Sequence, residues 1–375
     1  MHRYSVEPRS GWQKRVEDLG LLYHTLRGEP YWDETACYQF TSYEIDQFEL
    51  AAQTLHEMCL DLVQYVVQER MFGLFMIPPE FEEMVIRSWE EQEPSIYGRF
   101  DFAYDGSGAP KLLEYNADTP TALVEAAVAQ WHWLKDKDEH GDQFNSIHER
   151  LIESWQALHA RDSSPITFVA MSGLVEDYIT VEYLRDTAIQ AGIETQYLNM
   201  EQIGYNHSTK MFVHGNTGQP IRRVFKLYPW EWMLKEQFGR FIPTSQTRWV
   251  EPPWKMILSC KSILPLLWER NPDCPYLLPA SFEPIEGSHV RKPIHAREGA
   301  NIKLVVNAQV QLETDGPYAG PYVYQRLAPM KSHDGKYPVF GCWIVNGIAC
   351  GMGIREDDSM ITGNTSRFVP HQMVD

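Results

Sequence analysis

The chain has 375 residues, which is enough for two or three packed lobes around a sizeable core. Its 43% hydrophobic and 22% charged residues are typical of an ordinary globular protein. The formal net charge of −18 argues against a nucleic-acid-binding or membrane-binding surface, because both require clustered Lys and Arg. We therefore expect neither nucleic acid nor a membrane as a partner.

The amino terminus lacks the apolar segment of a secretory signal, and no later run is long enough to span a bilayer. The six cysteines are scattered, without a CxxC pair or a histidine at zinc-site spacing. Reduced thiols in a cytoplasmic protein are the expectation.

Residues 1–95 are expected to form a mainly helical region. Thr41 and Glu44 have the spacing of a capping box, which predicts a helix starting after Thr41. The apolar residues that follow recur every three or four positions and predict one buried stripe: Ile45, Phe48, Ala52, Leu55, Cys59, Leu62 and Val66. Pro78 and Pro79 open a second predicted helix.

Residues 96–165 are expected to contain a hairpin and a helix over 122–134. Arg99 and Asp101 lie two residues apart in an alternating aromatic run, so a strand places them on one face. A turn at residues 105–108 leads to a returning strand, where Glu114 and Asn116 again share a face. If the strands pair, these four side chains converge on one patch.

Such a patch suits Mg²⁺, which takes oxygen ligands and is commonly held by one or two carboxylates together with substrate phosphates. Thr119 and Thr121 follow and place hydroxyls nearby. Taken alone, this spacing is more often an ordinary hairpin with a solvated charged face. The surrounding residues decide between the two interpretations.

Residues 166–245 are expected to form a βαβ lobe. A buried strand over 166–172, a helix over 176–191 and a strand over 193–198 indicate a parallel sheet. Residues 211–228 are predicted to form a hairpin around Asn216-Thr217-Gly218. The proline-rich stretch 243–253 is the predicted lobe boundary.

Residues 246–375 form the last predicted lobe, and they include two lysines of interest. Lys292 lies in a predicted strand before the flexible Gly299-Ala300 loop, an arrangement that can hold polyphosphate; an edge-strand lysine is an equally frequent explanation. Lys261 lies in a helical segment, where a surface lysine is the default. A hairpin turn is predicted at Asn346-Gly347. Gly351-Met352-Gly353 lacks the third glycine of a dinucleotide fingerprint, but Arg355 beyond it could reach into a cleft.

Four motifs in this order resemble the synthetase domain of the glutathionylspermidine synthase family: RFDFAYDGSGAPKLLEYNAD, VRKPIHAREGANI, YVYQRLAP and GIREDDSMITGNTSRFVPH. The resemblance covers essentially the whole chain and is strongest to stand-alone acid–amine ligases without an amidase domain. It implies a single synthetase unit over residues 1–375 of α+β class. The implied fold is ATP-grasp-like with a rearranged segment order, plus a βαβ lobe and the helical amino-terminal region.

The resemblance also implies a role for each residue. Metal ligands for two Mg²⁺ ions would be Asp101, Glu114 and Asn116, and the catalytic arginines would be Arg99 and Arg355. ATP would be held by Lys261, Lys292, Gly299 and Gln325, and the acid substrate by Thr119, Thr121 and Glu176. Leu227 departs from the family pattern, which has a threonine there, so ATP chemistry carries over better than glutathione recognition.

The implied activity is ATP-dependent amide-bond formation between a small acid and an amine, through an acyl phosphate. Glutathione and a polyamine are the family's precedent, but the sequence itself names neither substrate and leaves the oligomeric state open. Two alternatives remain: an ATP-dependent kinase of a small metabolite, and a catalytically inactive nucleotide-binding regulator. Retention of all the polar residues that ATP chemistry needs argues against the second.

Overall fold

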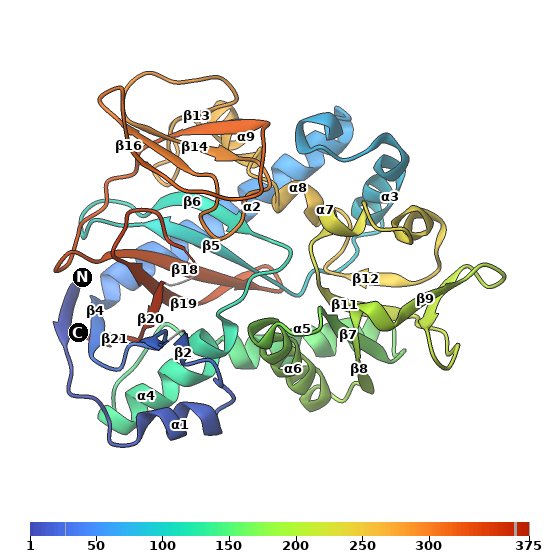
Figure 1. The fold of residues 1–375 in the computed structure, drawn as a ribbon, viewed down its shortest axis with the longest axis horizontal. Coiled ribbons are helices and arrows are strands. Elements are labelled where there is room, and N and C mark those ends of the chain that lie inside the picture. The colour runs from blue at the N-terminus through green and yellow to red at the C-terminus, as the bar shows by residue number, and fades with distance from the viewer. Residues whose placement is uncertain (27, 364–365, 375) are drawn as a thin grey trace.

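A five-stranded antiparallel sheet lies at the centre of the computed structural model, which describes residues 1–26, 28–363 and 366–374 (Figure 1). Asn364 and Thr365 of the fourth motif lie outside the described residues. The strands in sheet order are β20 (Arg367–Val369), β19 (Ile348–Asp357), β18 (Tyr337–Val345), β5 (Tyr97–Ala103) and β6 (Lys111–Asn116). The predicted hairpin of β5 and β6 is confirmed, as is the one of β18 and β19.

Both faces of the central sheet are covered by helices. Phe100 and Phe102 of β5 point toward helix α2 (Ser42–Gln68), where the ring of Phe48 packs edge-on against Phe102. On the other face Tyr97 stacks on Trp343, and helix α5 (Ile147–Arg161) covers them. The alternation in β5 thus separates two hydrophobic cores.

Helix α2 begins where its sequence predicts. The Thr41 hydroxyl accepts a hydrogen bond from the Glu44 amide, and the Glu44 carboxylate accepts one from the Thr41 amide, which completes the capping box. All residues of the predicted apolar stripe are buried. The second predicted helix, α3 (Pro79–Glu90), has proline at its first position.

A four-stranded parallel sheet forms the second lobe. Its strands in sheet order are β12 (Arg248–Val250), β11 (Arg223–Leu227), β7 (Ile166–Ala170) and β8 (Thr195–Asn199). Helix α6 (Val175–Gln190) connects β7 to β8, so the predicted βαβ unit is confirmed. Every residue of β11 is buried, as is typical of a central parallel strand.

The predicted hairpin over 211–228 is confirmed only around its turn, where Val213 bridges Pro220 in antiparallel fashion and the His214 amide donates to the Gln219 carbonyl. The prediction is wrong for the second strand. Strand β10 (Met211–His214) pairs with the preceding β9 (Ile203–Asn206), and β11 joins the parallel sheet instead. The Asn206 side chain accepts hydrogen bonds from the amides of Ser208 and Thr209, which sets the turn before β10. The buried sequence of β11 satisfies its hydrogen bonds better between β7 and β12 than in an exposed hairpin.

A third, five-stranded sheet lies over the edge of the central one (Figure 1). Its strands are β13 (Ala280–Ser281), β17 (Tyr322–Arg326), β14 (His289–Pro293), β15 (Lys303–Val306) and β16 (Gln309–Glu313). Helix α9 (Ile263–Arg270) packs against β13 and β17. Lys261 lies in the turn between α8 (Lys255–Leu258) and α9.

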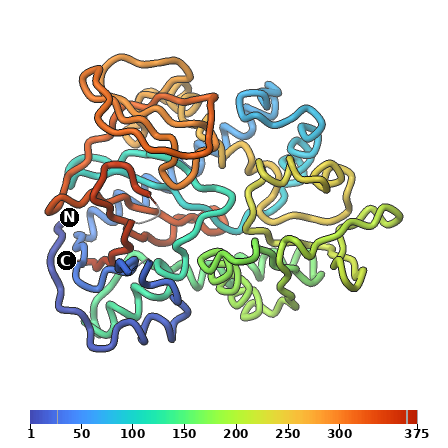
Figure 2. Tube along the Cα trace, in the orientation of Figure 1, coloured from blue at the N-terminus to red at the C-terminus, as the bar shows by residue number. Residues whose placement is uncertain are grey.

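Both ends of the chain contribute to one small sheet (Figure 2). Strand β1 (His2–Ser5) pairs antiparallel with β4 (Ala36–Thr41), and β21 (His371–Val374) pairs parallel with β4 on its other side. The remaining elements are α1 (Trp12–Asp18), β2 (Thr25–Leu26), β3 (Glu29–Pro30), η1 (Phe72–Phe75), the π turn η2 (Glu125–Ala129), α4 (Gln130–Lys137), η3 (Met200–Gln202), α7 (Trp230–Met233) and η4 (Gly239–Thr244). Among the described residues, no helix is both long and apolar enough to cross a membrane.

A buried ion pair joins the parallel sheet to the central one. The Lys226 ammonium at the end of β11 lies 2.6 Å from the Asp118 carboxylate, which follows β6, and neither side chain is exposed. Asp118 also accepts a hydrogen bond of 2.9 Å from the Trp230 amide. Burial lowers the pKa of Lys226, and Asp118 counteracts that shift by stabilising the charged form.

Replacing Lys226 with methionine is expected to lower the free energy of unfolding by about 3–5 kcal/mol, because it leaves Asp118 as an uncompensated buried charge. Urea unfolding followed by circular dichroism measures this loss. Lys235→Met, at an exposed position, is the control. Equal stability of the two variants would contradict the structural role of the pair.

Candidate active site

Most of the predicted site residues line one cleft. Its cavity has a volume of about 290 Å³ and lies where the central sheet, the third sheet and the carboxyl edge of the parallel sheet meet. Of the predicted site residues, those that line it are Arg99, Asp101, Glu114, Asn116, Thr119, Thr121, Lys261, Lys292, Gly299, Gln325 and Arg355. Glu176 does not line it.

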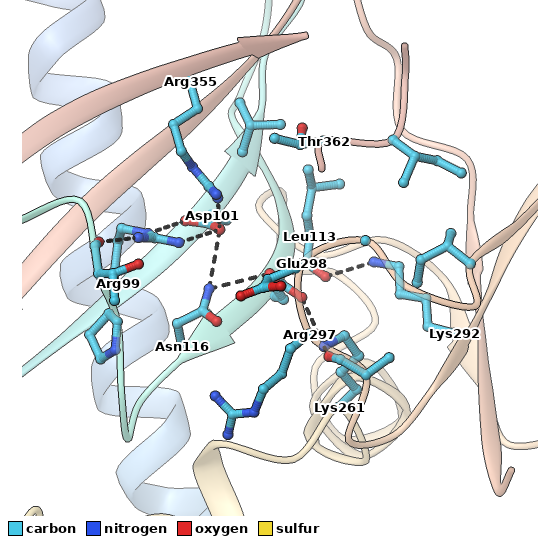
Figure 3. A pocket seen from close by; sticks show the side chains of 18 of the residues that line it. Arg99, Asp101, Leu113, Asn116, Lys261, Lys292, Arg297, Glu298, Arg355 and Thr362 are labelled. Atoms are coloured by element: carbon cyan, nitrogen blue, oxygen red, sulfur yellow. Dashed lines mark hydrogen bonds and ion pairs between the residues drawn. The ribbon is translucent and has the colours of Figure 1, made fainter. Parts of the chain in front are cut away.

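Asp101 is the centre of the polar network. Arg99 donates to both of its carboxylate oxygens, from Nε at 2.6 Å and from Nη2 at 3.0 Å. Arg355 donates to Oδ2 at 2.9 Å and Asn116 donates to the same oxygen at 3.1 Å. Figure 3 shows Arg355 reaching this carboxylate from β19 while Arg99 approaches it along β5.

The strand register produces this convergence. Asp101 pairs with Glu114 on β6 and with Gly341 on β18. A Cβ atom on Gly341 would come within 2.7 Å of the Arg99 side chain, so glycine is needed for Arg99 to lie across the sheet. Burial alone would lower the pKa of Arg99, but Asp101 raises it, so the guanidinium stays charged.

Glu114 and Lys261 form the second charged pair. The Lys261 ammonium lies 3.0 Å from Glu114 Oε2 and donates to the Ala296 carbonyl at 2.6 Å. Burial would raise the pKa of Glu114, but Lys261 and Lys292 lower it well below its usual range. The Glu114 carboxylate is therefore ionised, as a cation ligand must be.

The donor set fits Mg²⁺. Asn116 donates to Asp101 and, at 3.3 Å, to Glu114 Oε1, so one amide lies within hydrogen-bonding distance of two carboxylates. Hard oxygen donors of this kind suit a cation that keeps several waters and shares substrate phosphates. Within the described ranges, no group of three or more His, Cys, Asp or Glu side chains is arranged to hold a metal. A cation here would therefore need water and substrate phosphates as further ligands.

Lys292 is fixed by neighbouring strands. Its ammonium donates to the Leu113 carbonyl at 2.9 Å (Figure 3). It also donates to Gln325 Oε1 at 2.8 Å. Gln325 in turn donates to the Leu112 carbonyl at 2.8 Å. Burial lowers the pKa of Lys292 to about 8, against the opposing influence of Glu114. Gln325 therefore positions Lys292 in addition to lining the cavity.

The loop after β14 closes one side of the cleft. Arg297 donates to Thr119 Oγ1 at 2.8 Å and forms an ion pair of 2.7 Å with Glu231 on α7. Gly299 has a φ of +68°, and a Cβ atom there would lie 2.5 Å from the Thr362 carbonyl oxygen. Glycine is required at this point because the loop packs directly on the chain after β19.

Several residues of the cleft wall were not predicted from the sequence, among them Arg297, Trp232 and Asp177. Arg297 lies two residues before Gly299, and an arginine so close to this loop was a usable signal. Trp232 and Asp177 gave no signal, since their place depends on how the lobes meet. Asp177 lines the cavity where Glu176 was expected, and burial together with Glu176 raises the pKa of Asp177 to about 6.

The fold is that of glutathione synthetase-like proteins. The structure of a glutathione synthetase-like effector from Globodera pallida covers 97% of this chain, and the match covers 96% of that chain, with a TM-score of 0.60 at 10% sequence identity. At that identity the similarity concerns the fold alone.

The chain belongs to the glutathionylspermidine synthase family, whose preATP-grasp model matches residues 3–374. A Haemophilus influenzae protein named “Putative acid–amine ligase” is 43% identical, and the match covers 96% of both chains. Trypanothione synthetase from Crithidia fasciculata is 28% identical over 94% of this chain and 58% of its own length. Bifunctional glutathionylspermidine synthetase/amidase from Escherichia coli is 27% identical over 96% of this chain and 63% of its own length. The family is thus one of ATP-binding ligases that form carbon–nitrogen bonds.

Affinity for Mg·ATP is expected to fall above pH 8. The pKa of Lys292 is about 8 in the free protein, and bound phosphate favours the ammonium, so binding raises this pKa. The expected interaction between the Lys292 ammonium and an ATP phosphate is complete well below pH 8. Affinity then falls by up to about tenfold per pH unit above pH 8. Calorimetric titration between pH 7 and 9.5 measures the effect.

Lys292→Arg is the matched control, because a guanidinium stays charged throughout that range. The arginine variant is expected to show a flatter pH profile. An unchanged profile would assign the pH dependence to another group.

Proposed function

We propose that this protein is an ATP-grasp-like acid–amine ligase that forms an amide bond through an acyl phosphate. The observation that carries the proposal is the convergence of Arg99 and Arg355 on Asp101, in the same cleft as Lys261 and Lys292. Membership of the glutathionylspermidine synthase family supports it.

The lysines and the closing loop serve the nucleotide. Lys261 and Lys292 supply ammonium groups for ATP phosphates, and the loop around Gly299 covers them. In the free protein Lys261 is paired with Glu114. Phosphate binding would release Glu114 from this pair and leave its carboxylate facing the site.

Asp101, Glu114 and Asn116 would hold Mg²⁺, which when bound neutralises charge on the ATP phosphates. Asp101 has a further role that involves only side chains of this protein. Its two oxygens hold Arg99 and Arg355 in fixed orientations, so these guanidiniums are aimed before the reaction starts.

The reaction would proceed in two steps. A substrate carboxylate oxygen attacks the γ-phosphorus of ATP, forming the acyl phosphate and releasing ADP. An unprotonated amine then attacks the acyl carbon, the carbon–oxygen bond to phosphate breaks, and the amine loses one proton to the departing phosphate as the amide forms. Arg99 and Arg355 stabilise the negative charge on the transferring phosphoryl group and on the acyl phosphate.

The acid would bind beside Thr119 and Thr121. The Thr121 carbonyl accepts a hydrogen bond of 2.6 Å from Arg99, which places this segment next to the catalytic arginines. Glu176 and Asp177, near the amino terminus of α6, add negative charge that suits a protonated amine before it reacts. The name of the Escherichia coli relative, glutathionylspermidine synthetase/amidase, makes glutathione the first acid to test and spermidine the first amine.

The direct test is ADP release from Mg·ATP in mixtures of one acid and one amine, run beside Glu114→Ala. ADP formation that requires both partners and is abolished in the variant is the expected result. Turnover with an acid alone would instead indicate a carboxylate kinase. ATP binding without ADP formation in any mixture would contradict a ligase.

Arg355→Ala is expected to retain ATP binding but to lose about 10³–10⁵-fold in kcat, the range seen for arginines that stabilise phosphoryl transfer. Calorimetry measures ATP binding and ADP release measures turnover. Arg150→Ala, on the exposed surface of α5, is the control. Parallel losses of affinity and rate in Arg355→Ala would mean that this arginine binds the ground state.

A further inference from the structure

The part of the cleft beside the parallel sheet is lined by apolar side chains. Met171 follows β7, Leu227 ends β11, and Tyr228 comes next, all at the carboxyl edge of the sheet. Ligands of parallel α/β sheets bind outside this edge. These side chains therefore face the position of a substrate and not only a hydrophobic core.

Two large apolar residues on the same wall are exposed to solvent. The exposed fraction is 52% for Leu174, at the start of α6, and 40% for Trp232 on α7. Leu227 lines the same cavity and is 3% exposed. A concave apolar surface next to a few polar groups is the usual form of a small-molecule site.

Charge on this wall disfavours a second anion. The amino terminus of α6 would attract a carboxylate, but Glu176 and Asp177 already occupy its first turn. Of the described residues that line this part of the cavity, Arg297 is the cation. Its guanidinium is engaged by Glu231 at 2.7 Å and by Thr119 at 2.8 Å (Figure 3 shows Arg297 beside the polar network).

We infer that the acid substrate is a monocarboxylate with an apolar body. Its carboxylate meets Arg99 and Arg355, and its body lies against Met171, Leu174, Leu227 and Trp232. This inference rests on the proposed ligase function and defines the substrate class of the same site. This substrate class differs from that of ligases whose acid substrate carries a second carboxylate.

Chain length and charge of the acid give the first test. Binding of acetate, butyrate, hexanoate, glutarate and glutathione to the protein with Mg²⁺ and a non-hydrolysable ATP analogue is measured by calorimetry. Affinity is expected to rise about 4-fold per added methylene, the factor that corresponds to about 0.8 kcal/mol. Hexanoate is expected to bind about 100-fold or more tightly than glutarate, whose second carboxylate would lose water without gaining a partner.

A cation placed on the wall should reverse this preference. Leu174→Arg is expected to weaken hexanoate binding about tenfold or more and to strengthen glutarate binding. Val175→Arg is the matched control, since Val175 is also 52% exposed and adjoins Leu174 but does not line the cavity. The control should bind both acids as the unaltered protein does.

The outcomes separate the substrate class from the proposed function. Tighter binding of glutarate or glutathione than of hexanoate would overturn the inference and leave the ligase proposal standing. No dependence on chain length, or an equal effect of the two arginine variants, would also overturn it. Binding of hexanoate with the expected selectivity, but without ADP release with any amine, would support the apolar site and count against the ligase.

Discussion

A buried carboxylate surrounded by cationic and amide donors determines the geometry of the cleft. Asp101 is 2% exposed, and ionisation at such a site is costly unless the charge is paired. Arg99, Arg355 and Asn116 provide this pairing from strands β5, β19 and β6. A shift of any one of these strands by one residue would turn its side chain to the other face of the sheet and leave a buried charge unpaired. Strand register and catalytic geometry are thus specified by the same contacts.

In the free protein the lysines of the cleft already have partners. A bound ligand can replace these partners, so no lysine charge has to be left unpaired. Lys261 is paired with Glu114, and Lys292 is held by Gln325 and a backbone carbonyl. Phosphates can replace these partners without large movement of the strands that carry the lysines. The loop with Arg297 and Gly299 is not part of a strand. It is held by Glu231 and Thr119 and by contact with the chain near Thr362. Ligand-dependent rearrangement is therefore expected to be concentrated in this loop.

The sequence predicted those features that depend on local periodicity. Side chains alternate between the two faces of a strand, and this alternation put Arg99 on the same face as Asp101, and Glu114 on the same face as Asn116. The βαβ unit followed from the order of its apolar segments. The hairpin predicted over 211–228 is wrong in its second strand and shows the limit, because both a hairpin and a parallel strand satisfy an apolar run ending at Leu227. The wall formed by Leu174 and Trp232 could not be foreseen either, since it exists only because α6, α7 and the central sheet line the same cavity. Long-range packing, not local propensity, decides these positions.

The small sheet that unites the chain ends has a consequence for connectivity. His2 pairs with Gln39 and Val374 pairs with Thr41, on opposite sides of β4. Two strand spacings amount to about 10 Å, which a linker of about four or five residues spans comfortably. The polypeptide is therefore suited to circular permutation: its ends can be joined at β4, and new ends opened in an exposed turn, while every strand that carries a cleft residue keeps its neighbours.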